Sequence, residues 1–189
     1  LIDNGHKVHV IDDLSTGNIN LIPKNVNFTE CNINNSNEII KILKSNNFDI
    51  LMHFAGYIKV EESVKYPEKY FKNNTENSIK LFETCKDNGL NKIIFSSTAA
   101  NYGMSGNAQV NENDDLNPQN PYAESKIQIE NYLKNNELVY NFIILRYFNV
   151  AGADHNLRSG QISKESTHLI KILSEAAVGN RDIVEIFGN

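Results

Sequence analysis

Tyr122 and Lys126 stand four residues apart, in the pattern Tyr-x-x-x-Lys. Side chains at this spacing lie on the same face of a helix, so the two groups are expected to be neighbours. A phenol ordinarily has a pKa of about 10 and is a poor base at neutral pH. A nearby cation stabilises the phenolate and lowers that pKa. The pair therefore predicts a general base with its own tuning cation, although chance alone gives this spacing in roughly one such chain of two.

Apolar runs of strand length alternate with helical patterns along the chain. Strands are predicted at 7–12, 26–31, 49–55, 92–97, 142–147 and 183–187, and helices at 37–45, 67–88, 121–136 and 165–179. The run at 49–55 is almost continuously apolar, as expected for a strand buried on both faces. The alternation predicts an α/β fold, a doubly wound parallel sheet of the Rossmann-like type with helices on both faces.

Ligands of such sheets bind where the strands end, and polar or small residues stand at these places. Asp12 ends a strand and could accept hydrogen bonds from ribose hydroxyls, which favours NAD over NADP, or it could simply form a turn. Gly56 follows the apolar strand and allows either close approach of a ligand or an ordinary turn. Thr98 could bind the same substrate oxygen as Tyr122, or cap local backbone.

Composition limits the classes of function. The chain has 189 residues, 40% hydrophobic and 22% charged, as in ordinary globular proteins. A net charge of −5 without a basic run argues against nucleic acid as a partner, and no apolar run reaches the length of a membrane span. Two cysteines favour a reducing, cytoplasmic location. The five histidines show no metal-ligand spacing; His53 is expected in the core, and no metal is assigned.

Seven motifs along the chain fit the pattern of one known family. They are Asp12-Asp13-Leu14, His53-Phe54-Ala55-Gly56, Phe95-Ser96-Ser97-Thr98-Ala99, Tyr102-Gly103, Pro121-Tyr122-x-x-Ser125-Lys126, Leu145-Arg146-Tyr147-Phe148-Asn149-Val150-x-Gly152-Ala153 and Ile186-Phe187-Gly188-Asn189. Together they resemble the UDP-glucose 4-epimerase family of extended short-chain dehydrogenases/reductases, over essentially the whole chain. The Tyr-x-x-x-Lys pair is common to the superfamily, whereas the last two motifs are more specific to the epimerases.

The resemblance implies an isomerase that uses NAD to epimerise a UDP-hexose (UDP-glucose/UDP-galactose) through a 4-keto intermediate, in galactose metabolism. Tyr122 would take the proton of the sugar 4-hydroxyl, Lys126 would bind the nicotinamide ribose and lower the Tyr122 pKa, and Thr98 would share the hydrogen bond to the sugar oxygen. The implied cofactor contacts are Asp12, Asp13, Leu14, Ser15, Thr16, Gly17, Asn32, Ile33, Phe54, Ala55, Gly56, Asn74, Thr98, Tyr122, Lys126 and Phe148. The implied substrate contacts are Thr98, Tyr122, Asn149, His168, Leu169, Glu185, Ile186 and Phe187. A homodimer is also implied, paired through the helices at 67–88 and 121–136.

The family's Gly-x-x-Gly-x-x-Gly loop would precede Asp12, and the 189 residues do not contain it. We therefore expect an N-terminally incomplete NAD-binding Rossmann-like domain over 1–150, truncated at its first strand, and the beginning of the substrate-binding region over 151–189. The strands at 7–12 and 49–55 would then have no neighbour between them, and these residues alone are expected to fold poorly and to be inactive. Turnover of UDP-galactose by the 189 residues would contradict this. Smaller departures are Asn32, where Asp is frequent, and Ile58, where Lys is frequent.

Three alternatives differ in the groups that they require. A 4,6-dehydratase of the same fold needs an acid pair directly after Thr98, where this chain has Ala99 and Ala100. An epimerase of another UDP-sugar would share every motif above. A non-catalytic NAD-binding protein would keep the strand ends but would usually lose Tyr122 or Lys126, and both are present.

Overall fold

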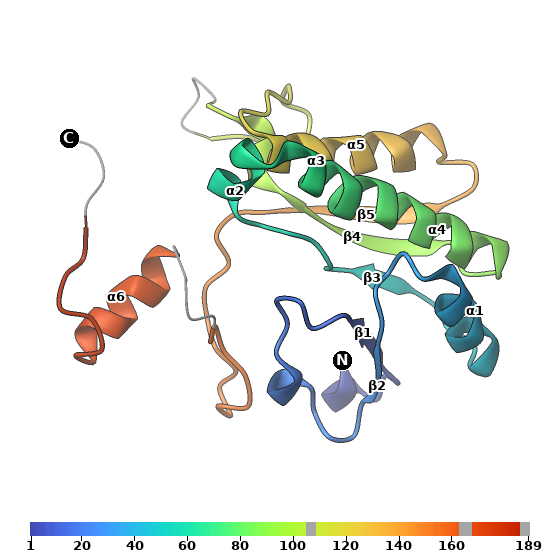
Figure 1. The fold of residues 1–189 in the computed structure, drawn as a ribbon, viewed down its shortest axis with the longest axis horizontal. Helices are drawn as coiled ribbons and strands as arrows, with labels where there is room; N and C mark the ends of the chain where they lie inside the picture. Colours follow the sequence, from blue (N-terminus) through green and yellow to red (C-terminus); the bar gives the residue numbers. More distant parts are fainter. Residues whose placement is uncertain (105–108, 163–167, 186–189) are drawn as a thin grey trace. The chain divides into compact units, whose positions relative to one another are not determined.

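The computed structural model describes residues 1–104, 109–162 and 168–185 and divides the chain into two compact units, Leu1–Phe148 and Asn149–Asn189. All strand pairs in the described residues are parallel. The strands are β1 (His9–Asp12), β2 (Asn27–Glu30), β3 (Leu51–His53), β4 (Lys92–Thr98) and β5 (Asn141–Tyr147) (Figure 1). The predicted α/β fold with a parallel, Rossmann-like sheet is confirmed.

The strands form two separate sheets in the described residues. β1 pairs with β2, and β3, β4 and β5 form the second sheet in that order. Asp12 stands opposite Glu30 at the end of the first sheet, and Thr98 stands opposite Tyr147 at the end of the second. No described strand lies between β1 and β3, as the sequence predicts.

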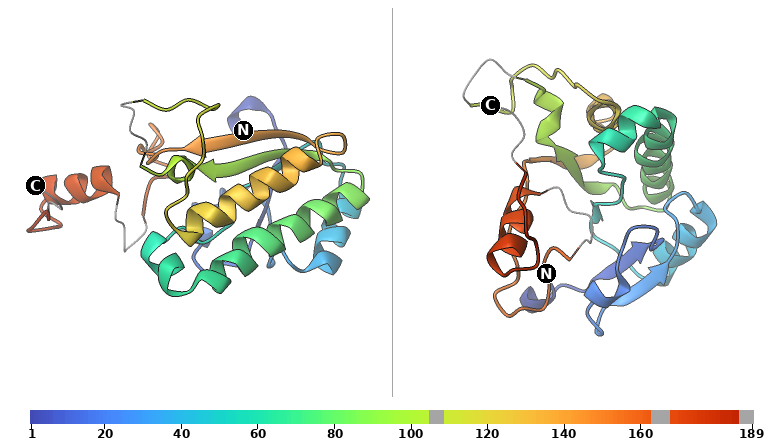
Figure 2. Two further views of the ribbon diagram at one scale, coloured as in Figure 1. Left: turned by 90° about the horizontal axis from the view of Figure 1, so that it is seen from above. Right: turned by 60° about the vertical axis from the view of Figure 1, so that its left-hand side comes forward.

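Helices α1 (Ser36–Ser45), α4 (Asn77–Asp87) and α5 (Pro121–Asn135) lie side by side on one face of the larger sheet (Figure 2). Their apolar faces meet alternate residues of β4 in one core. The fully or almost fully buried members of this core include Ile39, Leu81, Phe82, Cys85, Ile93, Phe95, Ile129 and Leu133. On the opposite face of the sheet, Met52 is 37% exposed and Ile143 56% exposed. The prediction that β3 is buried on both faces is therefore wrong for the described chain.

The single helix predicted at 67–88 is interrupted. It consists of α3 (Pro67–Tyr70), a π-helical turn (Phe71–Glu76) and α4. In this wider turn the neighbouring residues Asn74 and Thr75 are both buried. Asn74 bonds to the Tyr57 carbonyl, and Thr75 bonds to the Ser125 carbonyl of α5. The sequence analysis also missed α2 (Val60–Lys65), a short helix that precedes Pro67.

Helix α5 begins at a well-defined cap. The Asn120 side chain accepts a hydrogen bond from the Ala123 backbone N–H (2.9 Å), and Pro121 occupies the first helical position. This cap fixes where the helix starts and so places Tyr122 in its first turn. Shorter 3-10 turns occur at Ile2–Asn4, Ile19–Leu21 and Ala99–Tyr102.

The second unit contains α6 (Leu169–Ala177), inside the helix predicted at 165–179. Residues 165–167 lie outside the described residues, as do Ile186 and Phe187 of the strand predicted at 183–187. Residues 183–185 have no regular secondary structure, so this part of the predicted strand is not formed. None of the described helices is long and apolar enough to cross a membrane.

Gly103 ends the 3-10 turn after β4 with φ of 63°, and it lies directly against another backbone segment. A Cβ atom added there would stand 2.0 Å from the Asn117 carbonyl oxygen. We expect Gly103→Ala to lower the free energy of unfolding by about 2–4 kcal/mol, measured by urea denaturation of the full-length protein. Gly89→Ala is the matched control, because Gly89 also has positive φ (89°) but open space around it. Equal losses in the two variants would contradict the steric explanation.

Candidate active site

Tyr122 and Thr98 meet at the edge where β4 ends. Thr98 is the last residue of β4 and is 8% exposed, and its hydroxyl lies close enough to the Tyr122 hydroxyl to favour the phenolate. Thr98 Oγ1 also accepts a bond from the Ala100 N–H (3.2 Å), which holds the hydroxyl in place. Tyr122 is half-buried, and the Tyr70 ring packs edge-on against it at 6.5 Å between centroids. A pair of hydroxyl groups thus lies at the end of β4, and Thr98 also caps local backbone.

The electrostatic setting of Tyr122 differs from the one expected. Burial raises the pKa of Tyr122, and the hydrogen bond with Thr98 offsets this only in part. The net shift is therefore upward, opposite to the lowering expected from Lys126, whose ammonium group donates to the Ser96 carbonyl oxygen.

Lys126 is 3% exposed, and its ammonium group lies against β4. Nζ donates to the Ser96 carbonyl oxygen (3.0 Å) and stands 5.1 Å from the centroid of the Phe95 ring. Burial lowers the pKa of Lys126 to about 8. A group with this pKa keeps its charge at neutral pH at a cost in stability, which is typical of functional lysines.

The turn after β3 also lies close to Lys126. Gly56 has φ of 153°, and a Cβ atom there would lie 3.1 Å from Asn74 Oδ1 and 3.5 Å from Lys126 Nζ. Asn74 holds the turn by accepting from the Tyr57 N–H (2.8 Å) and donating to the Tyr57 carbonyl (3.0 Å). Asn74 is fully buried, so its side chain supports the turn and the Ser125 hydroxyl (3.3 Å).

A cleft lies at the ends of β1, β2 and β3 and gathers most of the residues predicted to bind the cofactor. Its lining includes Asp12, Asp13, Ser15, Thr16, Asn32, Ile33, Ala55 and Gly56. The sequence analysis did not single out Cys31, Tyr57 and Asn73, which also line it. Their proximity in sequence to Asn32, Gly56 and Asn74 is the signal that could have found them.

The loop after β1 is shaped around two carboxylates. Asp12 Oδ1 accepts from the Leu14 N–H (2.7 Å), and Leu14 adopts positive φ (56°). Gly17 packs so tightly on Asp12 that an added Cβ would lie 2.5 Å from Oδ1. Asp13 accepts from Asn32 Nδ2 (2.6 Å), so the amide at position 32 joins the two strand ends. A carboxylate beside small residues suits the ribose hydroxyls of a dinucleotide.

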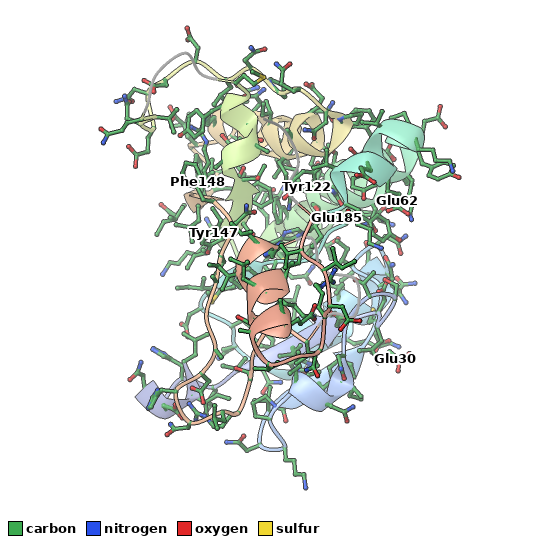
Figure 3. The ribbon with its side chains drawn as sticks, turned by 90° about the vertical axis from the view of Figure 1, so that its left-hand side faces the viewer. Glu30, Glu62, Tyr122, Tyr147, Phe148 and Glu185 are labelled. Atoms are coloured by element: carbon green, nitrogen blue, oxygen red, sulfur yellow. The ribbon has the colours of Figure 1, made fainter. Side chains whose placement is uncertain are left out.

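Two further predicted residues of the first unit, Phe54 and Phe148, do not line this cleft. Phe54 is 56% exposed at the end of β3, and Phe148 is 71% exposed after β5. Tyr147 and Phe148 project from the edge at which β4 and β5 end, the edge that faces the viewer in Figure 3. Asn149, His168, Leu169 and Glu185 belong to the second unit. Ile186 and Phe187 lie outside the described residues.

The sequence analysis missed a buried carboxylate on the same helix. Glu130 is fully buried, four residues after Lys126 and eight after Tyr122. It is bonded to Arg146, Ser97 and Asn101. The four-residue spacing was the available signal. The described residues contain no group of three or more potential metal ligands.

Two comparisons with known proteins agree on one family. The sequence profile of the NAD dependent epimerase/dehydratase family matches residues 1–189. A UDP-glucose 4-epimerase from Azospirillum brasilense is 41% identical over 190 residues, which cover 100% of this chain and 55% of that protein. The chain thus spans little more than half the length of that relative.

Solved structures give the same result. A crystal structure of a UDP-glucose 4-epimerase superposes with a TM-score of 0.95 at 34% identity, covering 100% of this chain and 58% of the other. A UDP-glucose 4-epimerase from Brucella ovis, solved in complex with NAD, gives a TM-score of 0.92 at 32% identity, covering 99% and 58%.

Proposed function

Because the chain belongs to the NAD dependent epimerase/dehydratase family, we propose that the full-length protein is an NAD-dependent UDP-glucose 4-epimerase of galactose metabolism. The observation that carries this proposal is the pair of neighbouring hydroxyls of Tyr122 and Thr98 at the end of β4, with the Lys126 ammonium group bonded to the same strand. Similarity to UDP-glucose 4-epimerases over the whole chain supports the choice of substrate.

Each of three side chains has a separate role at the sugar or the cofactor. Tyr122 accepts the proton of the 4-hydroxyl and later returns a proton to the same oxygen. The Thr98 hydroxyl, held by the Ala100 N–H, keeps that oxygen within reach of the phenol. The Lys126 ammonium would bind the ribose of the cofactor, and in that position, one helical turn from Tyr122, its charge would favour the phenolate.

The cleft at the ends of β1, β2 and β3 fits the adenosine half of NAD. Asp12 accepts from the ribose hydroxyls, and its negative charge disfavours a 2′-phosphate. Gly56 lets the backbone come close to the cofactor, in a turn held by Asn74. NAD held in this way would supply reversible hydride transfer at C4 of the sugar without being consumed.

The rival activities lack specific support. A 4,6-dehydratase would need an acid pair after Thr98, where Ala99 and Ala100 begin a 3-10 turn instead. An epimerase acting on another UDP-sugar remains the second candidate, because it would use the same Tyr122, Lys126 and Thr98. A sensor that only binds NAD would not need a buried lysine beside a strand-end phenol.

The test is an assay of the full-length protein with UDP-galactose. We expect conversion to UDP-glucose without added nicotinamide cofactor, and release of NAD, not NADP, when the purified protein is denatured. UDP-N-acetylgalactosamine tested in parallel separates the second candidate. Protein that retains NAD but converts neither sugar would refute both enzymatic proposals.

We propose a homodimer and a cytoplasmic location for the full-length protein, on narrower grounds. Cys31 and Cys85 are both free thiols, as suits a reducing compartment. Dimer formation follows the family resemblance, and the pairing surface would be polar. The described parts of α4 and α5 have no strongly exposed large apolar side chain. Size-exclusion chromatography that shows only monomer would refute the dimer.

A further inference from the structure

Three consecutive residues of β4 each meet a different residue of α5. Ser96 accepts from Lys126 at its carbonyl oxygen, and the Thr98 hydroxyl lies beside the Tyr122 side chain. Between them, the Ser97 hydroxyl donates to Glu130 Oε1 (2.6 Å). Tyr122, Lys126 and Glu130 follow each other at four-residue spacing, so one face of α5 is fixed to the strand end by polar contacts at three levels.

Glu130 connects more than these two elements. Arg146 of β5 donates to both carboxylate oxygens, from Nε to Oε1 (3.0 Å) and from Nη2 to Oε2 (2.7 Å). Asn101 Nδ2 donates to Oε1 (2.9 Å), and the exposed Lys134 lies 3.5 Å from Oε2. We call Glu130, Arg146, Ser97 and Asn101 the Glu130 cluster.

The cluster extends to the segment that follows the strand. Arg146 Nη1 donates to the Tyr102 hydroxyl (2.8 Å) and to the Glu112 carbonyl (3.2 Å). The Asn101 carbonyl accepts from the Asn117 N–H (2.9 Å). The cluster therefore joins the 3-10 turn, the 109–120 segment, α5 and β5.

The carboxylate of Glu130 is ionised in this setting. Burial by itself would raise the pKa of Glu130, but the bonds from Arg146 and Ser97 outweigh it and leave the pKa below its usual value. Bidentate bonds from a guanidinium are strong and directional, so they define one orientation. Such buried pairs contribute to structural specificity more dependably than to stability.

We propose that Glu130 is a positioning residue, which holds the Tyr122 hydroxyl in register with Thr98 by fixing α5 to the ends of β4 and β5. This inference rests on the proposed function. Two residues close to the cluster in sequence belong to the proposed site. Thr98 directly follows Ser97, and Phe148, a predicted cofactor contact, follows Arg146 by two positions. A small rotation of α5 would break the hydroxyl pair without unfolding the helix.

The test compares Glu130→Gln and the milder Ser97→Ala and Arg146→Lys in the full-length protein. We expect kcat for UDP-galactose to fall roughly 10- to 100-fold in Glu130→Gln while KM changes little, because misplacement affects the reacting atoms more than binding. Loss of the Thr98 contact should raise the Tyr122 pKa further, because a group that favours the phenolate is lost. That pKa is measured by ultraviolet titration, as the difference between each protein and the same protein carrying Tyr122→Phe.

Leu133→Ala is the matched control for lost stability, because Leu133 is fully buried on the same helix but packs only in the apolar core. It should lower Tm without moving the Tyr122 pKa or kcat. A double-mutant cycle with Thr98→Ala completes the test. If Glu130 acts through Thr98, then Glu130→Gln should reduce kcat much less in the Thr98→Ala background.

The titration separates failure of this inference from failure of the proposed function. If the parent protein converts no UDP-hexose, the function is refuted, and the Tyr122 titration still decides the role of Glu130. An unchanged Tyr122 pKa in folded Glu130→Gln, Ser97→Ala and Arg146→Lys overturns the inference. So does a Leu133→Ala variant that loses as much kcat as Glu130→Gln at equal loss of Tm.

Discussion

Tyr122→Phe is expected to lower kcat for UDP-galactose by roughly two to four orders of magnitude in the full-length protein. The substitution removes the hydroxyl that takes the proton and leaves the ring, which packs at 6.5 Å against Tyr70. The proposed cofactor cleft does not include Tyr122, so NAD should remain bound to the variant. Steady-state turnover and the NAD released on denaturation are the two measurements.

Tyr132→Phe is the matched control for this variant. Tyr132 lies on the same helix, ten residues after Tyr122, and its hydroxyl is bonded to the Tyr140 hydroxyl (3.1 Å) and donates to Glu83 (3.4 Å). It should keep nearly full activity despite losing a hydrogen bond. Comparable losses from both substitutions would show that the effect is structural and would remove Tyr122 from the chemistry.

Lys126→Met is expected to change activity and stability in opposite directions. Turnover should fall roughly 100-fold or more, because the variant loses the cation that would bind the cofactor ribose and, in that position, favour the phenolate. Stability should rise at neutral pH, because the variant no longer buries an ammonium group whose pKa is held at about 8. The gain is at most about 3 kcal/mol, reduced by the unpaired Ser96 carbonyl that remains.

The sign of the pH dependence follows from the protons bound in each state. The folded protein loses the Lys126 proton near pH 8, whereas the unfolded chain keeps it to about pH 10.4. Between these values the unfolded state binds more protons, so the unfolding free energy of the parent protein rises with pH. The advantage of Lys126→Met should therefore be largest below pH 8 and shrink toward pH 10. Urea denaturation at pH 7, 8, 9 and 10 measures it.

Lys80→Met is the control for removing a lysine that bonds to a carbonyl. Lys80 Nζ donates to the Asn34 carbonyl (2.8 Å) on the surface of the molecule. Its removal should leave both turnover and the pH dependence of stability unchanged. A Lys126→Met variant that behaves like Lys80→Met would contradict the account of a buried cation.

The elements of the fold were predictable because their signals are local. Period and capping residues place α1 and α5 within one residue of the predicted bounds, and the apolar run around Ile93 and Phe95 marks β4. The break in the helix at 67–88 was not predictable, because Asn74 and Thr75 face inward only to meet Tyr57 and Ser125. Long-range bonds of this kind have no signature in local periodicity.

The candidate site also has features that were predictable from the sequence and features that were not. Residues after strands were predictable as a group, because the ends of parallel strands meet at one edge, and the cleft gathers Asp12, Asn32 and Gly56 accordingly. The direction of the Tyr122 pKa was not predictable, because it depends on burial and on where the Lys126 ammonium points. Residue spacing predicts the face of a helix on which a side chain lies, but not the group that the side chain contacts.

The π-helical turn at Phe71–Glu76 also limits how the length of this segment can vary. An α-helix advances by about 100° per residue. Inserting a residue would therefore rotate α3 against α4, whereas deleting one would close the π-helical turn into an ordinary α-helix and turn Asn74 away from Tyr57. Single-residue insertions and deletions at 71–76 should therefore be rejected far more strongly than substitutions at its exposed positions, such as Lys72 or Glu76. A deletion-scanning library scored for folding would make this contrast visible.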